Sequence, residues 1–126
     1  MPLNAPRYRT QPPINAYGDG GFRIGGQRVE GSILLTPEGF YPWPTVVQPE
    51  DITPETLGPV VEAAPSFEIL LLGTGPAILR PDPQTRAFLS DANIPFDVMD
   101  TGAAARTYNV LLAEERRVAA ALIAVD

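Results

Sequence analysis

The sequence predicts one α/β domain: a three-layer sandwich with a parallel β-α-β-α-β second half and an N-terminal antiparallel β meander. Two observations predict this fold class. From residue 53 onward, apolar runs of strand length alternate with segments that open on helix-start signals. Before residue 45, short alternating runs are separated by glycine turns instead. At 126 residues, the chain is long enough for one hydrophobic core and too short for two comfortable ones.

Residues 1–15 are predicted to form a flexible N-terminal arm, and residues 16–126 the single domain. Four prolines interrupt the first fifteen residues, and no apolar period runs through them. A segment that cannot bury apolar surface stays disordered, and such segments concentrate at the ends of domains. We therefore exclude residues 1–15 from the predicted core.

Residues 17–43 are predicted to form the antiparallel meander. Gly25-Gly26 separates two alternating runs, and this pair favours a two-residue hairpin because such a turn needs positive φ angles. Thr36-Pro37-Glu38-Gly39 is typical of a second turn, in which proline presets φ and glycine closes the turn. We expect the meander either to extend the parallel sheet or to pack beside it.

Three helices are predicted, over residues 53–64, 82–91 and 103–114. The first two begin with a capping residue followed by proline, as in Thr53-Pro54 and Asp82-Pro83. The cap accepts a hydrogen bond from a free amide of the first turn, and proline suits the first helical position because it has no N–H. The third helix follows the turn Asp100-Thr101-Gly102.

Three strands are predicted to alternate with these helices, over residues 67–72, 96–99 and 118–125. The first and last are almost entirely apolar, which is typical of strands covered on both faces of a sheet. A strand, a crossover helix and a second strand make parallel neighbours with right-handed connections. The second half therefore predicts a parallel sheet.

Two glycine turns, Gly73-Thr74-Gly75 and Asp100-Thr101-Gly102, follow consecutive parallel strands, so they meet at one edge of the sheet. Open α/β sheets bind ligands at that edge, and free amides at a helix start suit an anion. In the alternative that we favour, the small residues allow close packing and Asp100 or Thr101 caps the helix. The ligand hypothesis names these candidates: Gly73, Thr74, Gly75, Asp100, Thr101, Gly102, Arg106 and Tyr108.

The composition removes most catalytic chemistries. The chain has no His and no Cys, and all nine basic residues are Arg. Disulfides, thiolate sites and a serine nucleophile with a His or Lys partner are thereby excluded, and we assign no metal and no cofactor. A net charge of −6 argues against nucleic-acid binding. No apolar run approaches the ~20 residues of a transmembrane helix, and we expect a cytoplasmic protein.

The run Phe40-Tyr41-Pro42-Trp43-Pro44 is the best indication of a partner protein. Tyrosine and tryptophan are enriched at contact surfaces, although they also fill hydrophobic cores. Tyr41 and Trp43 are therefore our candidates for contacts with a partner.

Four segments carry a family resemblance: residues 21–26, 30–35, 68–75 and 99–111. They include a strand followed by Gly-Thr-Gly and the pattern Asp-Thr-x-x-Ala-x-x-Thr-Tyr-Asn. These segments resemble a family of small proteins of unknown biochemical function that includes mitochondrial complex I assembly factor three and the adipogenesis-associated domain-containing protein. The resemblance covers residues 16–125 and implies a three-layer α/β fold with an added β element. It implies no catalytic residues.

The mitochondrial members of that family imply a role in assembling a respiratory NADH dehydrogenase, and the absence of a mitochondrial presequence suggests a bacterial-type member. Our first hypothesis is therefore a non-enzymatic interaction protein, an accessory factor in such an assembly, with an unidentified protein partner. The alternative is a small-molecule or anion-binding protein, or an unrecognised enzyme, that uses the glycine-turn edge. We expect a monomer or a weak homo-oligomer.

Overall fold

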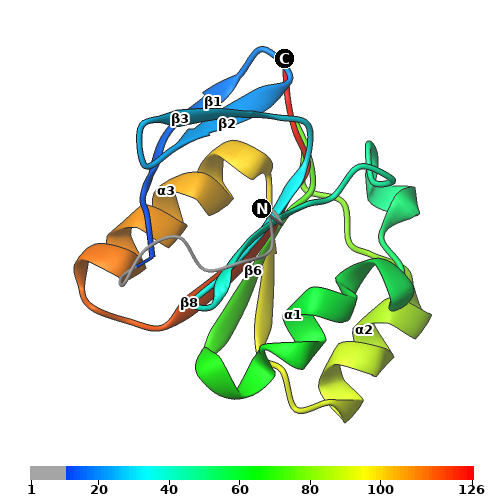
Figure 1. The fold of residues 1–126 in the computed structure, drawn as a ribbon. Helices are drawn as coiled ribbons and strands as arrows, with labels where there is room; N and C mark the ends of the chain where they lie inside the picture. Colours follow the sequence, from blue (N-terminus) through cyan, green and yellow to red (C-terminus); the bar gives the residue numbers. More distant parts are fainter. Residues whose placement is uncertain (1–10) are drawn as a thin grey trace.

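A five-stranded sheet forms the middle of the computed structural model, which describes residues 11–126 (Figure 1). Its strands are β4 (Ile33–Thr36), β5 (Gly39–Pro42), β6 (Ile69–Gly73), β7 (Phe96–Met99) and β8 (Val118–Leu122). They lie in the order β5-β4-β8-β6-β7. β8, β6 and β7 are parallel, as predicted for the second half of the chain, and β4 and β5 continue the sheet in antiparallel orientation.

A smaller antiparallel sheet contains β1 (Ile14–Gly18), β2 (Gly21–Ile24) and β3 (Gln27–Glu30). The predicted hairpin between β2 and β3 is confirmed, because Gly25 and Gly26 form its two-residue turn at φ angles of 55° and 85°. The predicted meander thus divides between two sheets. β1 to β3 pack beside the parallel strands, and β4 and β5 extend them, so each of the two expected arrangements describes one part.

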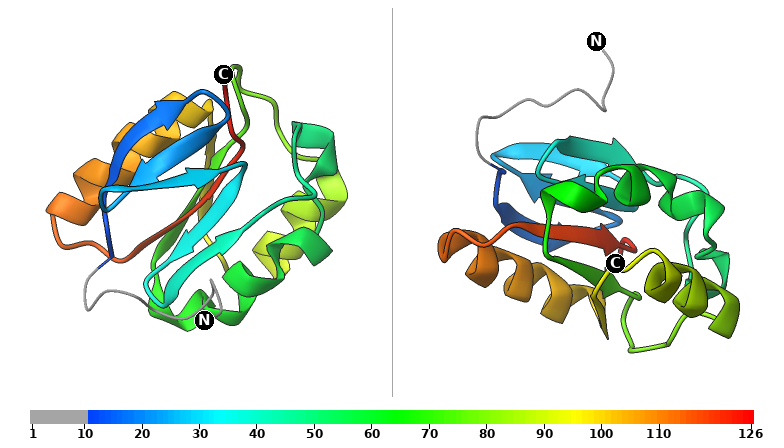
Figure 2. Two further views of the ribbon diagram at one scale, coloured as in Figure 1. Left: turned by 45° about the horizontal axis from the view of Figure 1, so that its top comes forward. Right: turned by 90° about the horizontal axis from the view of Figure 1, so that it is seen from below.

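The five-stranded sheet is covered on both faces, which gives three layers (Figure 2). α1 (Gly58–Glu62) and α2 (Pro83–Asp91) lie on one face, and α3 (Thr101–Ala113) with the smaller sheet lies on the other. On β6, Leu70 and Leu72 pack toward α1 and α2, whereas Leu71 packs toward α3. Two-sided burial explains the continuous apolar sequence of this strand. The predicted three-layer α/β class is therefore confirmed.

The helix starts follow the predicted capping pattern in α2 and α3. Asp82 Oδ1 accepts a hydrogen bond from Thr85 N and Asp100 Oδ1 accepts one from Ala103 N, each at 2.8 Å. The helix predicted from Thr53 is instead broken into a 3₁₀ turn (Glu55–Leu57), α1 and a second 3₁₀ turn (Ala64–Ser66). Gly58-Pro59 explains the break, because glycine favours helix weakly and proline donates no hydrogen bond.

The start of the domain differs from the predicted boundary at residue 16. Residues 1–10 of the expected arm lie outside the described residues. From Gln11 onward the chain is bound to α3: the Tyr108 hydroxyl donates to the Pro12 carbonyl at 2.9 Å, and the Asn109 side chain pairs with both backbone groups of Ile14, at 2.7 and 2.8 Å. β1 therefore begins inside the segment expected to be an arm. Among residues 11–126, no helix is long and apolar enough to span a bilayer.

Candidate functional site

The two glycine turns lie side by side at the carboxyl edge of the parallel strands, as predicted. Thr101 N donates to the Gly75 carbonyl at 2.8 Å. The chain passes from β6 to β7 on one side and then returns through α3 to β8 on the other side of β6. The carboxyl ends of β6 and β8 therefore form a topological switch point, the place where open α/β sheets hold ligands.

Two threonines occupy this edge, and their hydroxyls are engaged by the protein itself. The buried Thr101 hydroxyl donates to the Ile123 carbonyl at 2.7 Å and accepts from Gly75 N at 2.9 Å. Through these two hydrogen bonds, Thr101 connects the segments that follow β6, β7 and β8. Within the described part of the chain, no buried side-chain nitrogen or oxygen lacks a hydrogen-bond partner.

The other threonine, Thr74, shapes the loop between β6 and α2. Its hydroxyl lies 2.6 Å from the Ala77 carbonyl, to which it donates, and accepts from Leu79 N at 3.1 Å. These bonds close the first part of the loop without regular secondary structure. Thr74 therefore determines where residues 76–80, all of them exposed, are presented.

The two glycines beside Thr74 serve different purposes. A Cβ on Gly73 would lie 3.0 Å from Thr101 Cα and 2.8 Å from Leu122 Cδ2, so glycine is needed for the close approach of α3 to β6. Gly75 has more space around it but a φ of 97°, which other residues rarely adopt. Packing explains the first glycine and backbone conformation the second.

The start of α3 is capped and partly covered by side chains of the protein. Asp100 caps Ala103 N, and the backbone N–H of Thr101 is bonded to Gly75. A Cβ on Gly102 would lie 2.8 Å from the Tyr17 hydroxyl, and Arg106 donates to that hydroxyl at 2.7 Å. The capping and packing hypothesis thus describes the contacts of these residues, and Arg106 is directed to Tyr17.

Tyr108 lies apart from the other ligand candidates. Its side chain is buried with α3 and the smaller sheet, where its hydroxyl donates to Pro12 and accepts from Gln11 Nε2 at 3.3 Å. Burial raises the pKa of Tyr108 well above that of a free tyrosine, because the ionised form would lose its solvation. Tyr108 anchors the segment before β1 and does not reach the glycine-turn edge.

The two candidates for partner contacts, Tyr41 and Trp43, both pack against the hydrophobic core under α1 and α2. Trp43 is 3% exposed and packs in the core beneath α1 and α2, with its indole N–H donating to the Thr56 carbonyl at 2.8 Å. Tyr41 is half-buried against the same core. The core-filling alternative therefore describes Trp43, because its apolar ring is covered and its polar atom is already bonded.

An open groove lies at the switch point, and we call it the edge groove. It consists of two adjoining hollows of about 300 and 320 Å³ between segments 47–50 and 74–82, and both are lined by Pro49, Glu50 and Leu79. Ile123 and Ala124, directly after β8, also line it. The glycine-turn edge is therefore hollowed, although its threonine hydroxyls bond to the protein.

Exposed apolar side chains flank the edge groove. Val47 is 72% exposed, Ile78 60% and Leu79 51%. None of these residues was among the candidates predicted from the sequence. The sequence does contain a signal for the exposure of two of them. Ile78-Leu79 is an apolar pair in a proline-containing loop, and it belongs to no amphipathic helix or strand that would bury it.

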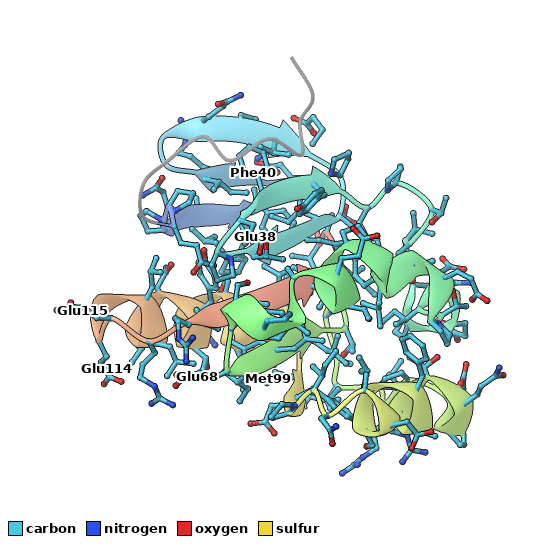
Figure 3. All side chains as sticks on the ribbon, turned by 60° about the horizontal axis from the view of Figure 1, so that its bottom comes forward. Glu38, Phe40, Glu68, Met99, Glu114 and Glu115 are labelled. Carbon is cyan, nitrogen blue, oxygen red and sulfur yellow. The ribbon has the colours of Figure 1, made fainter. Side chains whose placement is uncertain are left out.

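The opposite edge of the sheet, where β6 and β8 begin, is acidic. Four glutamates labelled in Figure 3 lie toward this end of the molecule: Glu38, Glu68, Glu114 and Glu115. Glu68 forms ion pairs with Arg116 and, at 3.7 Å, with Arg117. Such partly exposed pairs contribute little to stability. Since the exposed apolar side chains flank the edge groove instead, the groove is the better candidate site.

Comparison with known proteins identifies related chains over most of the sequence. The family described as "Protein of unknown function (DUF498/DUF598)" matches residues 14–123. The Xenopus tropicalis protein named NADH dehydrogenase [ubiquinone] 1 alpha subcomplex assembly factor 3 is 36% identical over 110 residues, which cover 87% of this chain and 60% of that protein. This chain thus spans about three fifths of that relative.

Bacterial relatives match more completely. An uncharacterized Rhodobacter capsulatus protein is 34% identical over 123 residues, covering 98% of this chain and 93% of that protein. A crystal structure described as an outer membrane protein from Bartonella henselae superposes with a TM-score of 0.88 at 43% identity, covering 95% of this chain and all of that one. The resemblance inferred from the sequence motifs is confirmed by these matches.

Proposed function

This chain belongs to the family of unknown function DUF498/DUF598, and on that premise we propose that it is a non-enzymatic interaction protein, an accessory factor in the assembly of a respiratory NADH dehydrogenase. Its eukaryotic relatives carry the name of an assembly factor for such an enzyme. An assembly factor acts by binding proteins, so a surface suited to protein contacts is the feature that this proposal requires.

The edge groove supplies that surface. Val47, Ile78 and Leu79 expose apolar side chains together at the rim of a hollow, and such exposed apolar groups are typical of interaction sites. The walls are also preorganised. Asp51 Oδ2 accepts hydrogen bonds from Val47 N at 3.0 Å and from Gln48 N at 3.2 Å, while Thr74 holds the opposite loop. A rigid surface loses less entropy on binding.

Small-molecule or anion binding is the second candidate, because the hollows lie at a topological switch point. Their volumes are near the lower end for ligand pockets, about 300 Å³. The polar groups at the edge favour the first proposal, since Thr74, Thr101 and Asp100 already bond within the protein. The chain has no His and no Cys, and all its basic residues are Arg, which removes most catalytic chemistries. This also favours an interaction protein over an enzyme.

The test is complementation in a bacterium that encodes both this protein and a multisubunit NADH dehydrogenase. Deletion of the gene should lower the amount of assembled enzyme, and wild-type protein should restore it. The double variant Val47→Asp, Leu79→Asp should fail, because two carboxylates at the groove oppose burial against a partner. Assembled enzyme is measured by native gel electrophoresis with an NADH activity stain.

Val110→Asp is the matched control, since Val110 is 55% exposed on α3, outside the lining of the groove. It should restore assembly as well as wild type does. Thermal unfolding of each purified variant confirms that it folds. Full restoration by the double variant, or normal assembly without the gene, would contradict the proposal.

A further inference from the structure

We propose that the edge groove binds an extended segment of the partner protein that carries apolar residues and at least one Lys or Arg. This inference rests on the proposed function and adds the chemistry of the partner. Three properties of the groove support it: the continuity of its two hollows, the extent of the apolar surface around it, and the sign of its charge.

The form of the groove suits an extended chain. The two hollows share Pro49, Glu50 and Leu79, so they make one continuous depression along segment 74–82. An extended segment advances about 3.3 Å per residue and directs alternate side chains to one side. Several of its residues then contact the groove, and apolar side chains at alternate positions reach both hollows.

The apolar surface extends beyond the hollows. Ile78 does not line either of them, yet it is exposed directly beside Leu79, and Val47 is the most exposed large apolar side chain of the described residues. A small molecule held in the hollow of about 300 Å³ contacts Val47 and Leu79, which line it, but leaves Ile78 in water. A polypeptide that continues past the hollow also covers Ile78, which favours a protein segment as the occupant.

The charge of the groove selects a basic segment. Its lining contains the carboxylates of Glu50 and Asp82 and the guanidinium of Arg80. One Asp82 oxygen is engaged by the cap of α2, whereas the ion pairs among residues 11–126 involve Glu30 and Glu68 and leave Glu50 out. A Lys or Arg on the partner forms a charge-assisted hydrogen bond with Glu50. With Arg80 counted, the charged residues of the lining carry one net negative charge, which disfavours an acidic segment or an anionic lipid surface.

The inference is tested by selecting peptides from a random octapeptide display library on immobilised wild-type protein, with counter-selection on Leu79→Asp. We expect the enriched peptides to combine apolar residues with Lys or Arg. The most enriched peptide is then synthesised, and its Kd is measured by fluorescence anisotropy for wild type and three variants.

Leu79→Asp should weaken binding of this peptide at least about tenfold, since it places a charge in the apolar contact. Glu50→Lys should weaken binding about three- to tenfold through charge reversal at the rim. Glu114→Lys makes the same charge change at the acidic edge shown in Figure 3 and should leave the Kd within about twofold.

Three results would overturn the inference: no enrichment, enriched peptides without basic residues, or binding that is unchanged by Glu50→Lys. The complementation assay separates these failures from failure of the proposed function. If the Val47, Leu79 double variant cannot support assembly while the selected peptides lack basic residues, the groove binds a partner of other chemistry. If the double variant does support assembly, the proposed function itself fails.

Discussion

At the residue scale, Gly73 shows why small residues recur at this edge of the sheet. Its missing side chain lets the first residue of α3 approach β6, because a Cβ would lie 3.0 Å from Thr101 Cα. Backbone cannot move aside as the end of a flexible side chain can. Packing thus explains the glycine at this position, with no need for a ligand.

We predict that Gly73→Ala lowers the free energy of unfolding by about 1–3 kcal/mol, the usual cost of overpacking a core. Gly102→Ala is the comparison, because its Cβ meets the movable ends of Tyr17 and Arg106 and alanine favours helix. It should cost clearly less. Urea unfolding followed by circular dichroism measures both, and equal stability of Gly73→Ala and wild type would contradict the packing explanation.

The buried Tyr108 makes stability depend on pH in alkaline solution. Its pKa is raised in the folded protein, whereas in the unfolded chain it stays near the ordinary value of about 10. Below pH 10 both states keep the proton and stability is unaffected. Above pH 10 the unfolded state ionises first, so the free energy of unfolding falls as pH rises.

We therefore predict that wild type loses stability above about pH 10 more steeply than Tyr108→Phe does. The variant lacks the ionisable group but keeps the ring in the core, so the difference between the two slopes isolates Tyr108. Urea unfolding at a series of pH values provides the measurement. Parallel slopes would show that the phenol is not held protonated by burial.

At the element scale, strands and helices with local signals were predictable. Gly25-Gly26 predicted a hairpin, and Asp82-Pro83 predicted the start of α2. β1 was not predicted, although Asp19-Gly20, which joins it to β2, is a strong hairpin signal. The prolines near β1 argued against a strand there. In addition, the backbone of Ile14 in β1 is bonded by the side chain of Asn109, which is distant in sequence and gives no local signal.

The loop from Thr74 to Asp82 is the element on which the proposed function depends. We predict that Thr74→Val keeps the fold but loosens this loop, because Leu79 N–H and the Ala77 carbonyl lose their shared partner. Amide hydrogen exchange at Leu79 should quicken at least about tenfold, and stability should fall by about 1 kcal/mol. Thr107→Val on α3 should leave that exchange rate unchanged. Unaltered exchange in Thr74→Val would mean that other contacts fix the loop.

At the scale of the whole molecule, the three layers were predictable and the site was only partly so. The apolar run of β6 indicated a strand with two covered faces, and the two glycine turns indicated the edge of the sheet at which the edge groove lies. The edge groove was not predictable from local sequence patterns. Segments 47–50 and 74–82 are separate in the sequence, and it is the order of the strands in the sheet that brings them together. The burial of Trp43 was likewise not predictable, because an aromatic residue type alone does not show whether the ring fills the core or lies at a contact surface.

The central claim is that the edge groove contacts a protein partner, and site-specific photo-crosslinking tests it most directly. A photoreactive amino acid is placed at position 79 in one strain and at position 110 in another, and crosslinked products are identified by mass spectrometry. We expect a subunit or assembly intermediate of the NADH dehydrogenase to be crosslinked from position 79 and to be absent from the products of position 110. Equal crosslinking from both positions, or none from position 79 in cells that assemble the enzyme, would contradict it.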